Sequence, residues 1–179
     1  MDLALLVLRV VVGLLFVGHG AQKLFGIWGG HGLAGTAGFF DSIGLKPGRI
    51  HAPAAGAAEF FGGALLALGL FTPFAAAAII GVMVAAVLSV HLPNGLWVTG
   101  NGYEYNLVLS AVAFALAGAG PGKWSLDHAF GLNLDGAAWA IVALGAGILG
   151  GIGAVLSGRS VARRQQPAQT TSTTSAEVS

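Results

Sequence analysis

The sequence predicts an all-α integral membrane protein: a four-helix transmembrane bundle plus a fifth, C-terminal transmembrane helix. The first observation is composition. Of the 179 residues 55% are hydrophobic and only 8% are charged, about a third of the charge of an average soluble domain. The second observation is the recurrence of apolar runs of about 20 residues, the length that crosses a hydrocarbon core about 30 Å thick.

Composition also excludes several classes of function. The net charge is only +1, and the sequence has no basic face or nucleic-acid-binding motif, so no nucleic-acid partner is expected. The chain contains no cysteine. Disulfides, thiolate catalysis and thiolate metal sites are therefore excluded.

The first apolar run covers residues 3–25 and is long enough to span a bilayer. Asp2 precedes this run and Arg9 interrupts it, whereas a cleaved signal peptide has a basic start and a shorter apolar core. We therefore expect a retained helix. Arg9 lies near its outer end, where we expect the side chain to extend to the lipid headgroups.

The later runs are separated by proline and glycine. Pro53 suits the first turn of the second helix, and Thr72-Pro73 separates the second helix from the third by a tight turn. Small residues at four-residue spacing recur in these runs and predict close helix packing. The expected organisation is a membrane domain at 1–130 with spans at about 3–25, 52–71, 73–92 and 104–119, a further transmembrane helix within 131–157, and a disordered polar tail at 158–179.

The first connection, residues 26–51, is long for a helical bundle. Its central part contains Phe39 and Phe40 between glycines and carries few charges. Such a segment is typical of a short amphipathic or re-entrant piece in the membrane interface. An ordinary loop is the alternative.

Positive charge predicts the orientation of the helices. With five spans, the first connection, the third connection and the C-terminus share one side of the membrane. That side carries six cations, and the fourth connection carries one: Lys23, Lys46, Arg49, Arg159, Arg163 and Arg164 against Lys123. We therefore expect a multi-pass protein of a bacterial inner membrane, with its C-terminus in the cytoplasm.

Polar side chains gather in the half of the membrane nearest that side. His19, Gln22 and Lys23 are spaced so that they share one helix face. Glu59 on the antiparallel second helix and His19 both lie roughly 10 Å below the same surface by helical rise. The predicted buried polar cluster comprises His19, Gln22, Lys23, Glu59, His91, Asn101, Tyr103, Glu104 and Asn106.

Several members of this cluster also have a purely structural interpretation. Glu59 can pair with Lys23 or His19 and so fasten two helices together. Glu104 can stabilise the first turn of the fourth helix through the helix dipole, and Asn101 can be an N-cap. His91, just before Pro93, can be an interfacial residue without a partner.

The functional interpretation is a buried site that exchanges protons. Carboxylate and cationic groups held together in a low dielectric can give or accept a proton near neutral pH. That chemistry suits a quinone head group, with His19, Lys23 and Glu59 as the contact residues, or a proton-coupled carrier. No metal is expected, since the chain lacks the Glu-x-x-His pairs of di-iron bundles. No catalytic residue can be named.

At these residues the sequence resembles the DoxX family of small bacterial membrane proteins. The matching stretches run from residue 3 to about 130 in a consistent order, whereas the fifth helix and the tail lie outside the four-helix core of that family. The stretches are GHGAQKLF at 18–25, GLAGTAGFF at 32–40, EFFGG at 59–63, HLPNG at 91–95, NGYEYNL at 101–107 and GPGKWSLD at 120–127.

The resemblance implies a membrane bundle associated with oxidoreductase systems and oxidative-stress assemblies. We therefore expect an integral membrane subunit of an oxidoreductase assembly, itself non-catalytic or at most quinone-interacting. It would dock soluble or membrane redox proteins, with homo-oligomers left open. A proton-coupled carrier for a small solute and a purely structural scaffold are the alternatives.

Overall fold

A computed structural model describes residues 1–164 of the chain, and this part is all-helical. Seven α-helices follow one another, and α4 continues through a π-helical turn, η1 (Val87–His91), and a short 3-10 turn, η2 (Leu92–Asn94). A second 3-10 turn, η3 (Val98–Gly100), precedes α5. The α-helices are α1 (Asp2–Phe25), α2 (Gly32–Ser42), α3 (Gly48–Leu68), α4 (Thr72–Ala86), α5 (Glu104–Ala119), α6 (Leu126–Ala129) and α7 (Ala137–Arg164).

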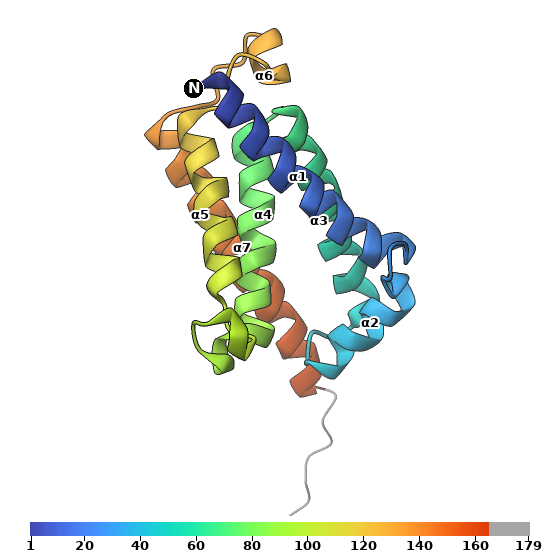
Figure 1. Ribbon diagram of the computed structural model, residues 1–179. Coiled ribbons are helices and arrows are strands. Elements are labelled where there is room, and N and C mark those ends of the chain that lie inside the picture. Colours follow the sequence, from blue (N-terminus) through green and yellow to red (C-terminus); the bar gives the residue numbers. More distant parts are fainter. Residues whose placement is uncertain (165–179) are drawn as a thin grey trace, which may run out of the picture.

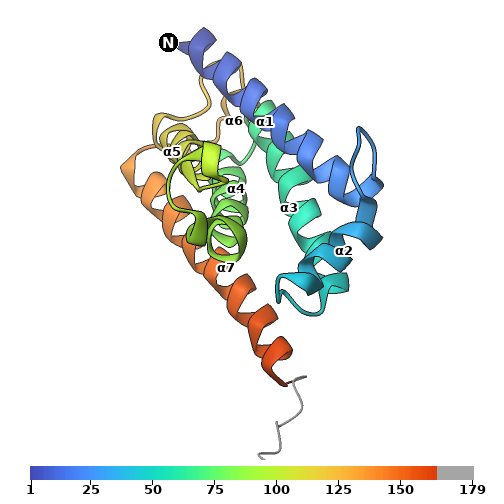
Figure 2. The same ribbon diagram turned by 60° about the horizontal axis from the view of Figure 1, so that its bottom comes forward.

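The helices form two groups that share one end. Helix α1 packs along α3, and α4 packs against α5 and α7 (Figure 1). Figure 2 shows α1, α2 and α3 on one side and α4, α5 and α7 on the other. The short α3–α4 turn joins the two groups near the N-terminus, while α2 and the end of α7 lie at the opposite end (Figure 1). At one end the chain itself connects the two groups through the α3–α4 turn. At the other end the groups meet through α2 and the end of α7, which are far apart in the sequence.

Glycines allow the closest helix contacts. At Gly63 of α3 an added Cβ would lie 2.5 Å from the carbonyl oxygen of Gly13 in α1, and the reverse contact has the same length. On α7, a Cβ at Gly151 would lie 2.6 Å from the carbonyl oxygen of Gly81 in α4. Such backbone proximity is how membrane helices gain packing energy without a hydrophobic driving force. The prediction of close packing by small residues is confirmed at Gly81, Gly147 and Gly151.

The shared end is fastened by two buried charged residues. Arg9 is 2% exposed and donates hydrogen bonds to the carbonyl oxygens of Ala67 and Trp124. Asp127 is 1% exposed and accepts from the backbone N–H of Phe71 at 2.7 Å and from both the N–H and the hydroxyl of Thr72, at 3.0 and 2.7 Å. Arg9 thus satisfies a carbonyl at the end of α3, and Asp127 satisfies N–H groups at the start of α4. The expectation that Arg9 extends to headgroups is wrong.

The start of α3 and the end of α7 differ from the sequence prediction. Helix α3 begins at Gly48 rather than at about 52, because the Asp41 carboxylate accepts the Gly48 N–H at 2.7 Å and so extends the helix at its start. Pro53 consequently lies inside the helix. Helix α7 continues to Arg164, so residues 158–164 of the predicted tail are helical, and the rest of that tail lies outside the described residues.

The first connection contains a real helix, α2, rather than an ordinary loop. Within the described residues, three helical stretches are long and apolar enough to cross a membrane: Asp2–Phe25, Thr72–Asn94 and Ala137–Arg164. Helix α5 (Glu104–Ala119) is apolar but shorter. The chain is therefore a helical membrane protein in which three to four helices can span the bilayer. The span predicted at about 52–71, which corresponds to α3, stays a proposal.

Candidate functional site

The central feature of the site is an ion pair between α1 and α3. Lys23 Nζ lies 2.6 Å from Glu59 Oε2, and the two side chains are 26% and 5% exposed. Glycine permits this contact, because a Cβ at Gly56 would lie within 2.9 Å of Leu24 side-chain atoms and 3.3 Å from Lys23 Cβ. The pairing of Glu59 with Lys23, one of the two partners considered from the sequence, is confirmed.

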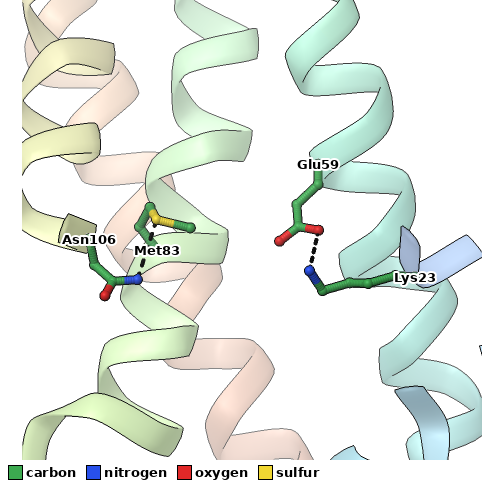
Figure 3. Close-up of polar contacts among 4 residues, drawn as sticks. All are labelled: Lys23, Glu59, Met83 and Asn106. Carbon is green, nitrogen blue, oxygen red and sulfur yellow. Dashed lines mark hydrogen bonds and ion pairs between the residues drawn. The ribbon is translucent and has the colours of Figure 1, made fainter. Parts of the chain in front are cut away.

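The pair faces a cavity of about 680 Å³ between the two helix groups. In Figure 3 both side chains lie on the side of α3 that faces α4. Alanine and glycine residues of α3, α4 and α7 form most of the wall, and Phe39 and Phe40 of α2 contribute aromatic rings. The polar residues at the wall are Lys23, His51, Glu59, Ser89 and His91. A mainly apolar cavity of this size with a few polar groups is typical of a small-molecule site.

The remaining predicted cluster residues do not all join this cavity. Asn106 is buried on α5, and its side-chain amide lies 3.4 Å from the sulfur of Met83 on α4 (Figure 3). Neither residue lines the cavity. Asn106 therefore contributes to the α4–α5 contact.

A second part of the predicted cluster builds the α4–α5 loop. His91 Nδ1 lies 2.9 Å from the Asn101 carbonyl oxygen, and the Glu104 carboxylate accepts the Val98 N–H at 2.9 Å. Tyr103 is the half-buried N-cap residue of α5. The N-cap interpretation of Asn101 is wrong, since its backbone is left-handed (φ 63°) and it ends the 3-10 turn η3. Of these loop residues only His91 reaches the cavity wall.

His19 and Gln22 are also outside the cavity. His19 is exposed on α1, and Gln22 is half-buried and donates a 3.1 Å hydrogen bond to the Trp28 carbonyl. The prediction of one buried cluster is therefore wrong for His19 and Asn101, which are both exposed. Residues four apart in a helix differ by about 40° in direction. The long Lys23 side chain extends across that angle to Glu59, and His19 does not.

Sequence reasoning missed Ser89, His51 and the α7 part of the wall. Ser89 lies in the π-helical turn η1, where its hydroxyl oxygen is shielded from solvent and has no hydrogen-bond partner among the described residues. In the sequence, Ser89 stands out as a polar residue within an apolar run, and that could have indicated it as a site residue. His51 precedes the predicted start of the second helix and becomes part of the wall only because α3 begins earlier.

The fold and the cavity define a class: a helical integral membrane protein with a mainly apolar cavity that has an ion pair at its wall. The family model described as DoxX matches residues 4–92, which include Lys23, Glu59, Ser89 and His91. A protein of Bacillus subtilis (strain 168) named "Putative oxidoreductase CatD" is 32% identical over 119 residues, covering 66% of this chain and 81% of that protein. The chain belongs to the DoxX family.

A second relative comes from Mycobacterium tuberculosis (strain ATCC 25618 / H37Rv) and is named "Uncharacterized membrane protein Rv3486". It is 29% identical over 131 residues, covering 68% of this chain and 77% of that protein. No solved structure matches this chain. The stretches at 101–107 and 120–127, which also resemble the family, lie beyond the region that the family model matches.

Proposed function

We propose that this chain is an integral membrane subunit of an oxidoreductase assembly and that its cavity binds a quinone. The observation that carries the proposal is the Lys23–Glu59 pair at the wall of a mainly apolar cavity. The name of the Bacillus relative supports the association with oxidoreductases. His19, which the sequence suggested as a third contact, is exposed outside the cavity and is not part of the proposed site.

The pair has the chemistry that a quinone ring requires. A protonated lysine has three N–H donors, and Lys23 uses one of them toward Glu59. A further N–H can donate to a ring carbonyl oxygen, while Glu59 keeps the ammonium group in place. The alanine and glycine wall leaves room for the flat ring and gives it apolar contact. A bound quinone would supply the electron-accepting chemistry, and this chain would hold and orient the ring.

Quinone content of the purified protein tests the proposal. The full chain is purified in mild detergent from its native membrane, and the extracted quinone is quantified per chain by mass spectrometry. Wild type and Glu104→Gln should carry about one quinone per chain, because Glu104 does not line the cavity. Glu59→Gln should lose most of it. Absence of quinone from folded wild-type protein would refute the proposal, and proton-linked solute uptake into proteoliposomes would then favour a carrier.

The same preparation tests for redox partners. The basic residues near the cavity end of the molecule, Lys46, Arg49 and Arg159 among them, would face the cytoplasm and dock acidic surfaces of soluble redox proteins. Co-purification of a flavin- or iron-containing protein at constant stoichiometry would support a redox assembly. A chain that copurifies with no redox protein at any detergent strength would contradict it.

Orientation can be measured because the chain has no cysteine of its own. Thr99→Cys in the α4–α5 loop and Asp135→Cys before α7 both introduce a thiol at an exposed position. In intact bacterial cells a membrane-impermeant maleimide should label the Asp135 variant and not the Thr99 variant. The opposite labelling would reverse the proposed cytoplasmic side, and labelling of both would contradict the number of spans.

A further inference from the structure

The π-helical turn η1 (Val87–His91) interrupts α4 at the cavity wall. Turns of this kind are rare and are frequently found at functional sites. This one is fixed from α7, because Arg159 donates a 2.7 Å hydrogen bond to the carbonyl oxygen of Leu88. The residue that follows Leu88 is Ser89, so the contact from α7 holds the backbone beside Ser89 in place.

Ser89 has a property that packing does not explain. Its hydroxyl oxygen is shielded from solvent, and no described residue accepts or donates a hydrogen bond there. Serine in a helix commonly bonds the carbonyl four residues earlier, as Ser110 does to Asn106 at 2.8 Å. A buried polar atom without a partner costs free energy, so such atoms are rare and call for a physical reason.

The register between α3 and α4 places Ser89 relative to the ion pair. A Cβ at Gly62 would lie 3.1 Å from the Cβ of Ala78, so these two positions are level. Glu59 is three residues before Gly62, Ser89 is eleven after Ala78, and the helices run in opposite directions. Helical rise then separates Glu59 and Ser89 by roughly 12 Å along the cavity.

We propose that Ser89 is a second ligand contact, which binds the far oxygen of a quinone ring whose near oxygen is held by Lys23. This inference rests on the proposed function and extends it to a specific mode of binding. A ring with oxygens on opposite edges, with a hydrogen bond of about 2.8 Å at each end, suits a separation of that order. Ser89 lines the cavity, and binding of the ligand would require a χ1 rotamer that directs its hydroxyl into that space.

Two probes distinguish a second contact from simple packing. Decylubiquinone carries ring oxygens at both ends, whereas 4-decylphenol carries a single oxygen. Each is titrated against the purified full chain in nanodiscs, with binding followed by isothermal titration calorimetry. The variants are Ser89→Ala, Ser89→Cys, which keeps the size but donates only weakly, and the control Ser157→Ala, whose hydroxyl bonds within α7 and does not line the cavity.

Loss of one hydrogen bond should weaken decylubiquinone binding by about 3- to 10-fold in Ser89→Ala, with Ser89→Cys between this value and wild type. Affinity for 4-decylphenol should not change in either variant. Equal weakening for both probes, or no change for either, would overturn the role of Ser89 while leaving the quinone site intact. Failure of the wild type to bind decylubiquinone would instead overturn the proposed function.

Discussion

Lys23→Met is expected to destabilise the folded chain more than Glu59→Gln does. The reason is the difference in burial within the pair: the Glu59 side chain is 5% exposed and the Lys23 side chain 26% exposed. Removing lysine leaves a buried carboxylate at the cavity wall without its cationic partner. Removing the negative charge leaves an ammonium group on a flexible stem, which can move toward water or headgroups.

The expected magnitudes follow from this asymmetry. An uncompensated buried charge costs about 3–5 kcal/mol, so Lys23→Met should lower the free energy of unfolding by about that amount. Glu59→Gln should cost about 1–2 kcal/mol, because the glutamine amide can still accept a hydrogen bond from Lys23. The double variant Lys23→Met/Glu59→Leu removes both charges and should unfold within about 1 kcal/mol of wild type.

Reversible unfolding by sodium dodecyl sulfate in mixed micelles, followed by circular dichroism, measures these differences. The double variant should regain stability without regaining quinone, which separates the structural part of the pair from ligand binding. Equal destabilisation by the two single variants would refute the reasoning from burial. A double variant as unstable as Lys23→Met would show that the cost lies in packing rather than in charge.

The close α1–α3 contact predicts opposite signs for two alanine substitutions. Gly63→Ala should cost about 1–3 kcal/mol, since the new Cβ meets backbone at 2.5 Å, whereas Gly18→Ala, with nothing within 4 Å, should be neutral or slightly stabilising. At the shared end, Asp127→Asn should cost about 1–3 kcal/mol, because an amide cannot accept all three hydrogen bonds from Phe71 and Thr72. The exposed Asp135→Asn is its control, and all four are measured by the same unfolding assay. Destabilisation by Gly18→Ala, or equal effects of the two aspartate changes, would contradict these assignments.

Much of the helical organisation could be predicted from hydropathy, because apolar runs of membrane length leave few alternatives. The order of the helices and the break at Thr72-Pro73 follow from the sequence in this way. The starts of helices were harder to predict. Helix α3 begins at Gly48 because Asp41 in the preceding segment accepts a hydrogen bond there, and the apolar run of α3 does not by itself indicate that contact.

The site was predictable only in part, since spacing along a helix does not define its rotation in the bundle. From the sequence, Glu59 had two candidate partners, Lys23 and His19, and the structure shows the pair with Lys23. His19 could not be placed, because its face of α1 depends on how closely Gly13 and Gly63 bring α1 to α3. Arg9 and Asp127 lie far apart in the sequence. Nothing in the sequence indicates that both side chains bind the backbone around the α3–α4 turn.

Arg9 and Asp127 hold the two helix groups together at one end, and the cavity separates the groups toward the other end. The cavity wall on α4 and η1 extends from Ala77 to His91, a lever of about 20 Å by helical rise. A rotation of one helix group by about 5° about the Arg9–Asp127 end would move the His91 end of this wall by about 2 Å relative to the other group. At the end opposite Arg9 and Asp127, the hydrogen bond from the Lys46 N–H to the Gly158 carbonyl links the two helix groups, and Arg159 binds Leu88 within its own group. The C-terminal helix, outside the region matched by the family model, therefore connects the two helix groups at the end where the cavity lies.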